Sequence, residues 1–184
     1  MKPLCLLLGL AVVMSATAVG AEPVKSGPQP AEKTPELKVF VATGDDKEKE
    51  SDVTAARKDK PTVYVFVQAE HWSRPMARFL KKLDEALPGI SDEAHIVAVW
   101  LSEKPDDAKA YLPKAQMSLH FQSTTLSVFL GEKSGPKDWG INVDAHLTAV
   151  VALKGKVVNS FGFVSVNDTD VPAVQNQLKK ALGK

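Results

Sequence analysis

The sequence has very little cysteine and almost no surplus charge. Cys5 is the single cysteine among 184 residues, and the formal net charge is +1. One thiol cannot support a fold held together by disulfides, and a balanced charge gives no general attraction to nucleic acid. The contents of 44% hydrophobic and 24% charged residues are those of a globular protein. Disordered and collagen-like chains are therefore excluded.

The N-terminal segment carries an export signal. A lysine at position 2 precedes a mostly apolar stretch, residues 4–18, and small residues follow as far as Ala21. This stretch is shorter than the roughly 20 residues that cross a bilayer. The pattern predicts a cleaved signal peptide over residues 1–21 and a secreted or periplasmic protein. Cleavage would remove Cys5, leave 22 basic and 22 acidic residues, and leave no stable membrane insertion.

Two further regions follow the predicted signal peptide. Residues 22–36 contain four prolines and few apolar side chains. Such a composition buries little apolar area, so it predicts a flexible proline-rich linker. Residues 37–184 are long enough to form one domain with its own hydrophobic core.

The pattern of apolar residues predicts a mixed sheet. The run at residues 62–67 is β-branched and aromatic without alternation, which is typical of a strand covered on both faces. Apolar positions at helical spacing predict a helix over residues 72–87. Strand–helix–strand units imply parallel pairing, and a late hairpin implies antiparallel pairing. The other expected elements are strands at 37–41, 94–101, 124–130, 147–153 and 157–164, helices at 52–58, 105–116 and from 171, and a solvated loop at 44–51.

The head of the 72–87 helix has a distinctive sequence. It reads Trp72-Ser73-Arg74-Pro75-Met76, and it resembles the Trp-Cys-Gly-Pro-Cys of thioredoxins with Ser73 and Met76 at the two cysteine positions. His146-Leu147-Thr148 likewise resembles the thioredoxin Ile-Pro-Thr, with Leu147 in place of the cis-proline. The resemblance to the thioredoxin-like superfamily implies an α/β fold with a mixed central sheet and helices on both faces.

The activity of that superfamily does not follow from the resemblance. Thiol-disulfide exchange needs a thiolate nucleophile and a second sulfur that resolves the mixed disulfide. Neither the hydroxyl of Ser73 nor the thioether of Met76 can supply them. We therefore expect an exported, redox-inactive binding or scaffold module with no cofactor and no catalytic residue.

A thioredoxin-like order of strands and helices would place four candidate binding residues together: Trp72, Ser73, Arg74 and His146. The head of a helix offers free N–H groups to anions, and Arg74 adds a positive charge. The expected partner is a protein or a small anionic ligand. A simpler alternative is that Ser73 only caps the helix.

Two other kinds of site remain as alternatives. A non-thiol enzyme could use this cluster, but a Ser73, His146 and Asp144 triad lacks the nucleophile elbow of a hydrolase. Zinc accepts nitrogen and oxygen ligands such as His71, His146 and Glu70. The four histidines are scattered and no H-E-x-x-H motif occurs, so no metal site is predicted.

Overall fold

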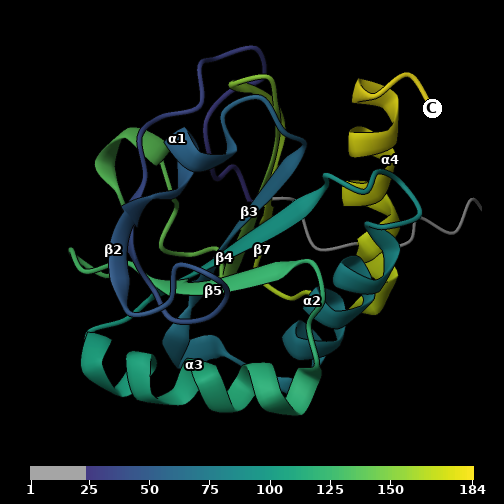
Figure 1. Ribbon diagram of the computed structural model, residues 1–184. Helices are drawn as coiled ribbons and strands as arrows, with labels where there is room; N and C mark the ends of the chain where they lie inside the picture. The colour runs from purple at the N-terminus through teal and green to yellow at the C-terminus, as the bar shows by residue number, and fades with distance from the viewer. Residues whose placement is uncertain (1–23) are drawn as a thin grey trace, which may run out of the picture.

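The computed structural model describes residues 24–184, so the predicted signal peptide and its cleavage point lie outside the described residues. One seven-stranded sheet organises this part of the chain, in the order β2-β1-β5-β4-β3-β6-β7 (Figure 1). The strands are β1 (Lys38–Val41), β2 (Lys49–Asp52), β3 (Thr62–Gln68), β4 (His95–Leu101), β5 (Thr124–Val128), β6 (Leu147–Leu153) and β7 (Lys156–Phe163). The strand β4 pairs in parallel with β3 and β5, and all other neighbours are antiparallel. The predicted mixed sheet is confirmed.

Helices lie on both faces of the sheet, but unevenly. The long helices are α2 (Arg74–Ala86), α3 (Pro105–Leu119) and α4 (Val171–Ala181), and the short ones are α1 (Val53–Arg57) and the 3-10 turns η1 (Ala69–His71), η2 (Lys137–Trp139) and η3 (Asp168–Asp170). All three long helices pack into one apolar cluster on one face, whereas α1 and η2 contribute to the cluster on the other. Within residues 24–184, no helix combines the length and apolar character needed to span a bilayer.

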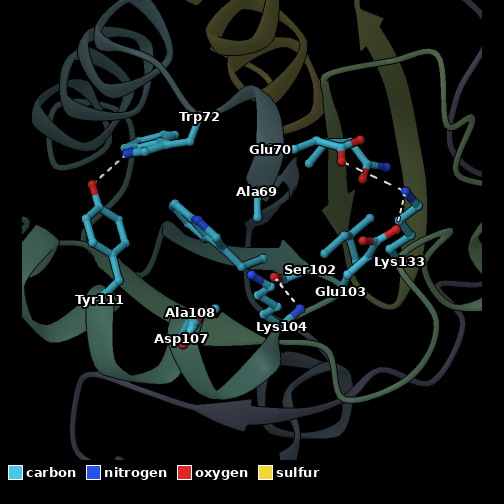
Figure 2. Close-up of a pocket in the computed structure, with 13 residues that line it drawn as sticks. Ala69, Glu70, Trp72, Ser102, Glu103, Lys104, Asp107, Ala108, Tyr111 and Lys133 are labelled. Atoms are coloured by element: carbon cyan, nitrogen blue, oxygen red, sulfur yellow. Dashed lines mark hydrogen bonds and ion pairs between the residues drawn. The ribbon is translucent and has the colours of Figure 1, made fainter.

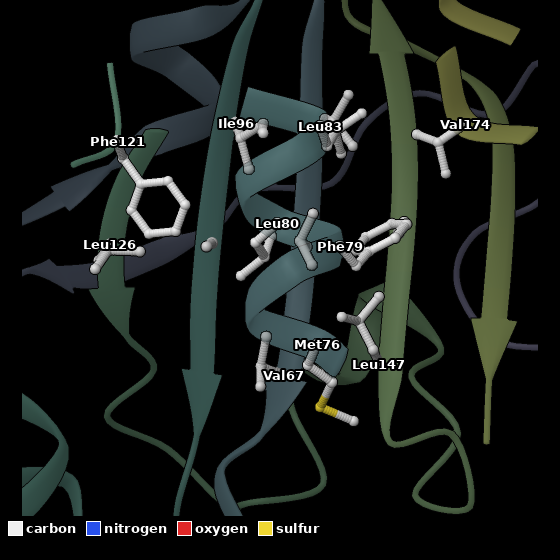
Figure 3. Close-up of a cluster of buried hydrophobic side chains, with 14 of the residues drawn as sticks. Val67, Met76, Phe79, Leu80, Leu83, Ile96, Phe121, Leu126, Leu147 and Val174 are labelled. Carbon is white, nitrogen blue, oxygen red and sulfur yellow. The ribbon is translucent and has the colours of Figure 1, made fainter. Parts of the chain in front are cut away.

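The central strand β3 is buried on both faces, as its uninterrupted apolar run predicts. Val65 and Val67 point to the face covered by the long helices, where α2 lies across the strands (Figure 3). Tyr64 and Phe66 point to the other face and contact Trp139, with ring centroids 5.1 and 4.9 Å away. Successive side chains of a strand alternate between faces, so each face receives its own apolar set. Trp139 therefore closes the face that lacks a long helix.

The charged segment before α1 is not simply a loop. Residues 49–52 form the edge strand β2, which pairs with β1 in a register that places Lys38 opposite Asp52. The prediction of a solvated loop was wrong here because pairing uses backbone groups, which the side-chain pattern does not report. The charged side chains of Lys49 and Glu50 are exposed, and charges on an edge strand discourage pairing with a second molecule.

The structure corrects the prediction of a flexible linker for residues 24–36. This segment runs beside the edge strand β7, with an antiparallel bridge from Val24 to Gly162. The hydroxyl of Ser26 is buried and lies 2.6 Å from the hydroxyl of Thr148. Composition failed as a guide because hydrogen bonds, rather than apolar burial, attach the segment to the sheet.

Gly162 allows the N-terminal segment to approach β7 closely, because it has no side chain. A Cβ atom at this position would collide with the carbonyl oxygen of Val24 and lie 2.9 Å from Cβ of Ser26. Gly162→Ala should therefore displace the N-terminal segment and lower the free energy of unfolding by about 1–3 kcal/mol. Denaturant unfolding and limited proteolysis within residues 24–36 measure both effects.

Gly89→Ala is the matched control, because a Cβ at Gly89 would meet only the carbonyl oxygen of Ala86, at an ordinary 3.6 Å. Equal stability and equal protease resistance of the two variants would contradict the docking of the segment against β7.

Candidate functional site

The head of α2 places the two residues that stand at the cysteine positions in different environments. Ser73 is the N-cap residue of α2, and its carbonyl accepts a hydrogen bond from the Ala77 N–H at 2.9 Å. Its side chain is exposed and makes no capping hydrogen bond, so the simple role of a side-chain cap is not observed. Met76 is only 3% exposed and packs into the core (Figure 3). The Met76 sulfur is thus part of the core rather than of a site.

Trp72 connects the head of α2 to α3. Its indole N–H donates to the hydroxyl of Tyr111 at 2.8 Å. Its ring also meets Trp100 edge to face, with centroids 4.9 Å apart. The three aromatic residues come from three different elements, so the contact depends on the tertiary fold and fixes the position of Trp72.

His146 lies beside the residue that precedes Trp72. Its ring stacks on His71, with centroids 3.6 Å apart and an angle of 15° between the planes. Its carbonyl accepts from the Gln68 N–H at 3.0 Å. Burial and then the neighbouring His71 lower the pKa of His146, and Glu70 opposes this shift.

Two cavities flank the bridge between Trp72 and Tyr111. Ser73 and Arg74 line the smaller cavity, of about 380 Å³. The larger, of about 440 Å³, lies between η1, the end of β4 and the start of α3. We call this larger space the aromatic cavity, because Trp72, Trp100 and Tyr111 line it together with Gln68. His146 lines neither of these two cavities, whereas the other three predicted binding residues, Trp72, Ser73 and Arg74, line the smaller one.

Figure 2 shows the aromatic cavity between an aromatic pair and an ionic cluster. Trp72 and Tyr111 face each other at one end. At the other end the Lys133 ammonium lies 2.6 Å from a carboxylate oxygen of Glu103 and 3.9 Å from one of Glu70. The short contact lowers the pKa of Glu103 and raises that of Lys133. One ammonium cannot neutralise two carboxylates, so this end of the cavity keeps a net negative charge, whereas the aromatic end supplies its apolar surface.

Gln68 lines the aromatic cavity and carries an unsatisfied polar group. Its side chain is 4% exposed, and its amide nitrogen Nε2 has no hydrogen-bond partner among residues 24–184. A buried donor without an acceptor costs about 1–3 kcal/mol. A ligand that places an acceptor beside Gln68 would remove this cost, so the amide is suited to recognition.

Two observations concern the alternative sites. The His146 ring stacks on the His71 ring. No group of three or more histidine, cysteine, aspartate or glutamate residues within 24–184 is placed to hold a metal ion.

The solved structures similar to this chain have the thioredoxin-like fold. One, assigned as the thiol:disulfide interchange protein DsbE of Chlorobium tepidum, has a TM-score of 0.61 and 19% identity, covering 84% of this chain and 99% of the other. The peroxidoxin BcpB of Mycobacterium tuberculosis has a TM-score of 0.59 and 11% identity, and the match covers 83% of this chain and 97% of the other. The exposed lipoprotein thioredoxin Etrx1 of Streptococcus pneumoniae has a TM-score of 0.54 and 16% identity, and the match covers 79% of this chain and 99% of the other.

By sequence, no protein-family model and no curated protein matches the chain. The structural likeness nevertheless confirms the predicted α/β class, with its mixed sheet and helices, and shows that the chain has a thioredoxin-like fold. At these low identities the likeness defines the fold alone.

Sequence reasoning missed two residues of the aromatic cavity. Gln68 had a usable signal, because it is a polar residue that ends an uninterrupted apolar strand, and ligands of open α/β sheets gather at the carboxyl ends of strands. Tyr111 had none, since it is one of several exposed residues on α3. Trp100 was expected in the core; it is 2% exposed and also lines the cavity.

Proposed function

We propose that this protein is an exported, redox-inactive thioredoxin-fold module that binds a partner in the aromatic cavity. The observation that carries the proposal is the replacement at the head of α2, where Ser73 and Met76 stand at the cysteine positions of thioredoxins. No cysteine occurs within residues 24–184. The described chain thus has the fold without the cysteines that thiol-disulfide exchange requires, and the aromatic cavity lies beside the head of α2.

Export is supported by two observations. The sequence begins with a signal-peptide pattern. One of the similar solved structures is described as an exposed lipoprotein. We therefore propose that the protein acts in the periplasm or outside the cell.

The lining of the aromatic cavity indicates the chemistry of the ligand. Trp72, Trp100 and Tyr111 favour an apolar or aromatic group, and the volume of about 440 Å³ lies in the range of small-ligand sites. The free N–H groups of Gln68 favour a carbonyl or another neutral acceptor on that group. The partner proposed here is a protein segment or small molecule that inserts an aromatic group bearing an amide.

A titration with N-acetyl-phenylalaninamide, followed by the indole N–H signals in NMR spectra, tests this assignment. We expect the signals of Trp72 and Trp100 to shift and saturate. Gln68→Leu should weaken binding about tenfold, because it removes a hydrogen bond worth about 1–1.5 kcal/mol. The same variant should unfold at a higher temperature, since it removes an unsatisfied buried amide.

Gln122→Leu is the control for this substitution, because Gln122 is exposed and lies outside the cavity. It should leave the affinity unchanged. If Gln68→Leu and Trp72→Leu bound the probe as tightly as the control, or if the indole signals did not move, the assignment of the cavity would be wrong.

A further inference from the structure

A third cavity lies at the opposite end of the sheet from the head of α2. With a volume of about 590 Å³, it is bounded by the N-terminal segment, by the loop that leads into β3 and by the turn between β6 and β7. Backbone hydrogen bonds join these parts: the Thr34 N–H donates to Gly155, and the Val157 N–H donates to Glu32, both at 2.9 Å. The walls of this cavity are therefore held in place by the docked segment.

Positive charge dominates the lining of this third cavity, which we call the basic cavity. The six cationic residues in its lining are Lys33, Arg57, Lys58, Lys60, Lys154 and Lys156, and the two acidic residues are Glu36 and Asp52. A surplus of four positive charges is concentrated here, although the whole chain carries only +1. Such a concave cluster of one sign attracts ions of the opposite sign.

The two acidic residues already have other partners. A carboxylate oxygen of Glu36 lies 2.8 Å from the ammonium of Lys38. Asp52 caps α1, and its carboxylate accepts from the Thr54 N–H at 3.0 Å and from the Ala55 N–H at 3.2 Å. Both carboxylates keep their negative charge, which the surplus of four already includes, but their oxygens are engaged by groups other than the cavity lysines.

Most of the lysines, in contrast, make no ion pair within residues 24–184. Lys60 lies 4.0 Å from Glu93, but Lys33, Lys58, Lys154 and Lys156 have no carboxylate within that distance in the described chain. These four ammonium groups come from three separate segments. They can thus surround a single ligand.

The lining also contains a polar group that has no hydrogen-bond partner. The hydroxyl oxygen of Thr34 is buried and unpartnered among residues 24–184. A hydroxyl donates to an anionic oxygen, and hydrogen bonds to ionised groups are the stronger ones. The only aromatic residue in the lining, Tyr64, is 2% exposed, so the cavity offers no surface on which a nucleic-acid base could stack.

We propose that the basic cavity binds a compact multivalent oxyanion, a group of phosphates or carboxylates joined in one small molecule. The four unpaired lysines supply charge and the Thr34 hydroxyl supplies a directed hydrogen bond. The site is independent of the aromatic cavity, which lies at the other end of the sheet.

Isothermal titration calorimetry of the purified protein with tripolyphosphate and with citrate tests the proposal. We expect binding of at least one of these anions at about 20 mM salt, weakened severalfold at about 200 mM. The anion that binds more tightly shows whether phosphate or carboxylate is preferred. The double variant Lys154→Gln/Lys156→Gln should lower the affinity at least tenfold.

Two further variants distinguish binding at a specific site from nonspecific attraction to positive charge. Lys179→Gln/Lys180→Gln removes the same charge from exposed positions on α4 and should leave binding within about twofold. Thr34→Val changes no charge and should weaken binding about fivefold through the lost hydrogen bond. The proposal is overturned if neither anion binds at low salt, or if the α4 variant weakens binding as much as the cavity variant.

Discussion

Replacing Asp84 by alanine should lower the free energy of unfolding by about 3 kcal/mol. Asp84 lies on α2 and is fully buried. Its carboxylate accepts hydrogen bonds from the Ser123 N–H at 2.8 Å, from the Thr124 hydroxyl at 2.7 Å and from the Gln122 N–H at 3.0 Å. Alanine would leave the buried Thr124 hydroxyl and two partly buried N–H groups without this acceptor, and the loss of an acceptor for a buried donor costs about 1–3 kcal/mol.

Urea unfolding of the Asp84 variants measures this effect. Asp84→Asn keeps one acceptor oxygen and should lose roughly half as much stability. Glu85→Ala is the control on the same helix, because Glu85 is exposed and pairs only with surface lysines. A loss below about 1 kcal/mol in Asp84→Ala would show that the carboxylate does not hold the start of β5 against α2.

Restoring two cysteines at the head of α2 should create a redox-active protein. In Ser73→Cys/Met76→Cys the new side chains stand three residues apart in the first helical turn, about 5–6 Å from each other. This spacing allows a disulfide. The N-terminus of a helix also lowers the pKa of a cysteine thiol placed there. Insulin reduction should rise from background to about an order of magnitude above it.

Each single cysteine variant is a control for the double variant. Ser73→Cys can attack a disulfide but has no second sulfur to resolve the product, and Met76→Cys places its thiol at a 3% exposed position. Neither should turn over in catalysis. A double variant that formed its disulfide but stayed at background would contradict the equivalence of these positions to the thioredoxin cysteines.

The sequence predicted the central sheet and α2 well because these elements depend on apolar patterns. Val65 and Phe66 belong to an unbroken apolar run that both faces of the sheet bury. Phe79 and Leu83 recur at helical spacing, and both are fully buried against the strands (Figure 3). In each element the buried positions that stabilise the fold are apolar, and their spacing is the strongest predictor of secondary structure.

The cavities and the N-terminal segment could not be predicted in this way. Backbone hydrogen bonds help to hold residues 24–36 against the sheet, and the pattern of side chains does not show which backbone groups will pair. The contact of Trp72 with Tyr111 joins residues 39 positions apart and depends on how α2 and α3 pack. Trp72, Ser73 and Arg74 line one cavity at the head of α2 and His146 lines neither cavity there, and the binding role of all four residues stays a prediction.

Insulin reduction by residues 22–184 is the most direct test of the central claim that this thioredoxin-like fold works without thiol chemistry. The account predicts that dithiothreitol-driven precipitation of insulin proceeds at the same rate with and without the protein, while Ser73→Cys/Met76→Cys accelerates it in the same assay. Catalysis by the unmodified chain would contradict the account.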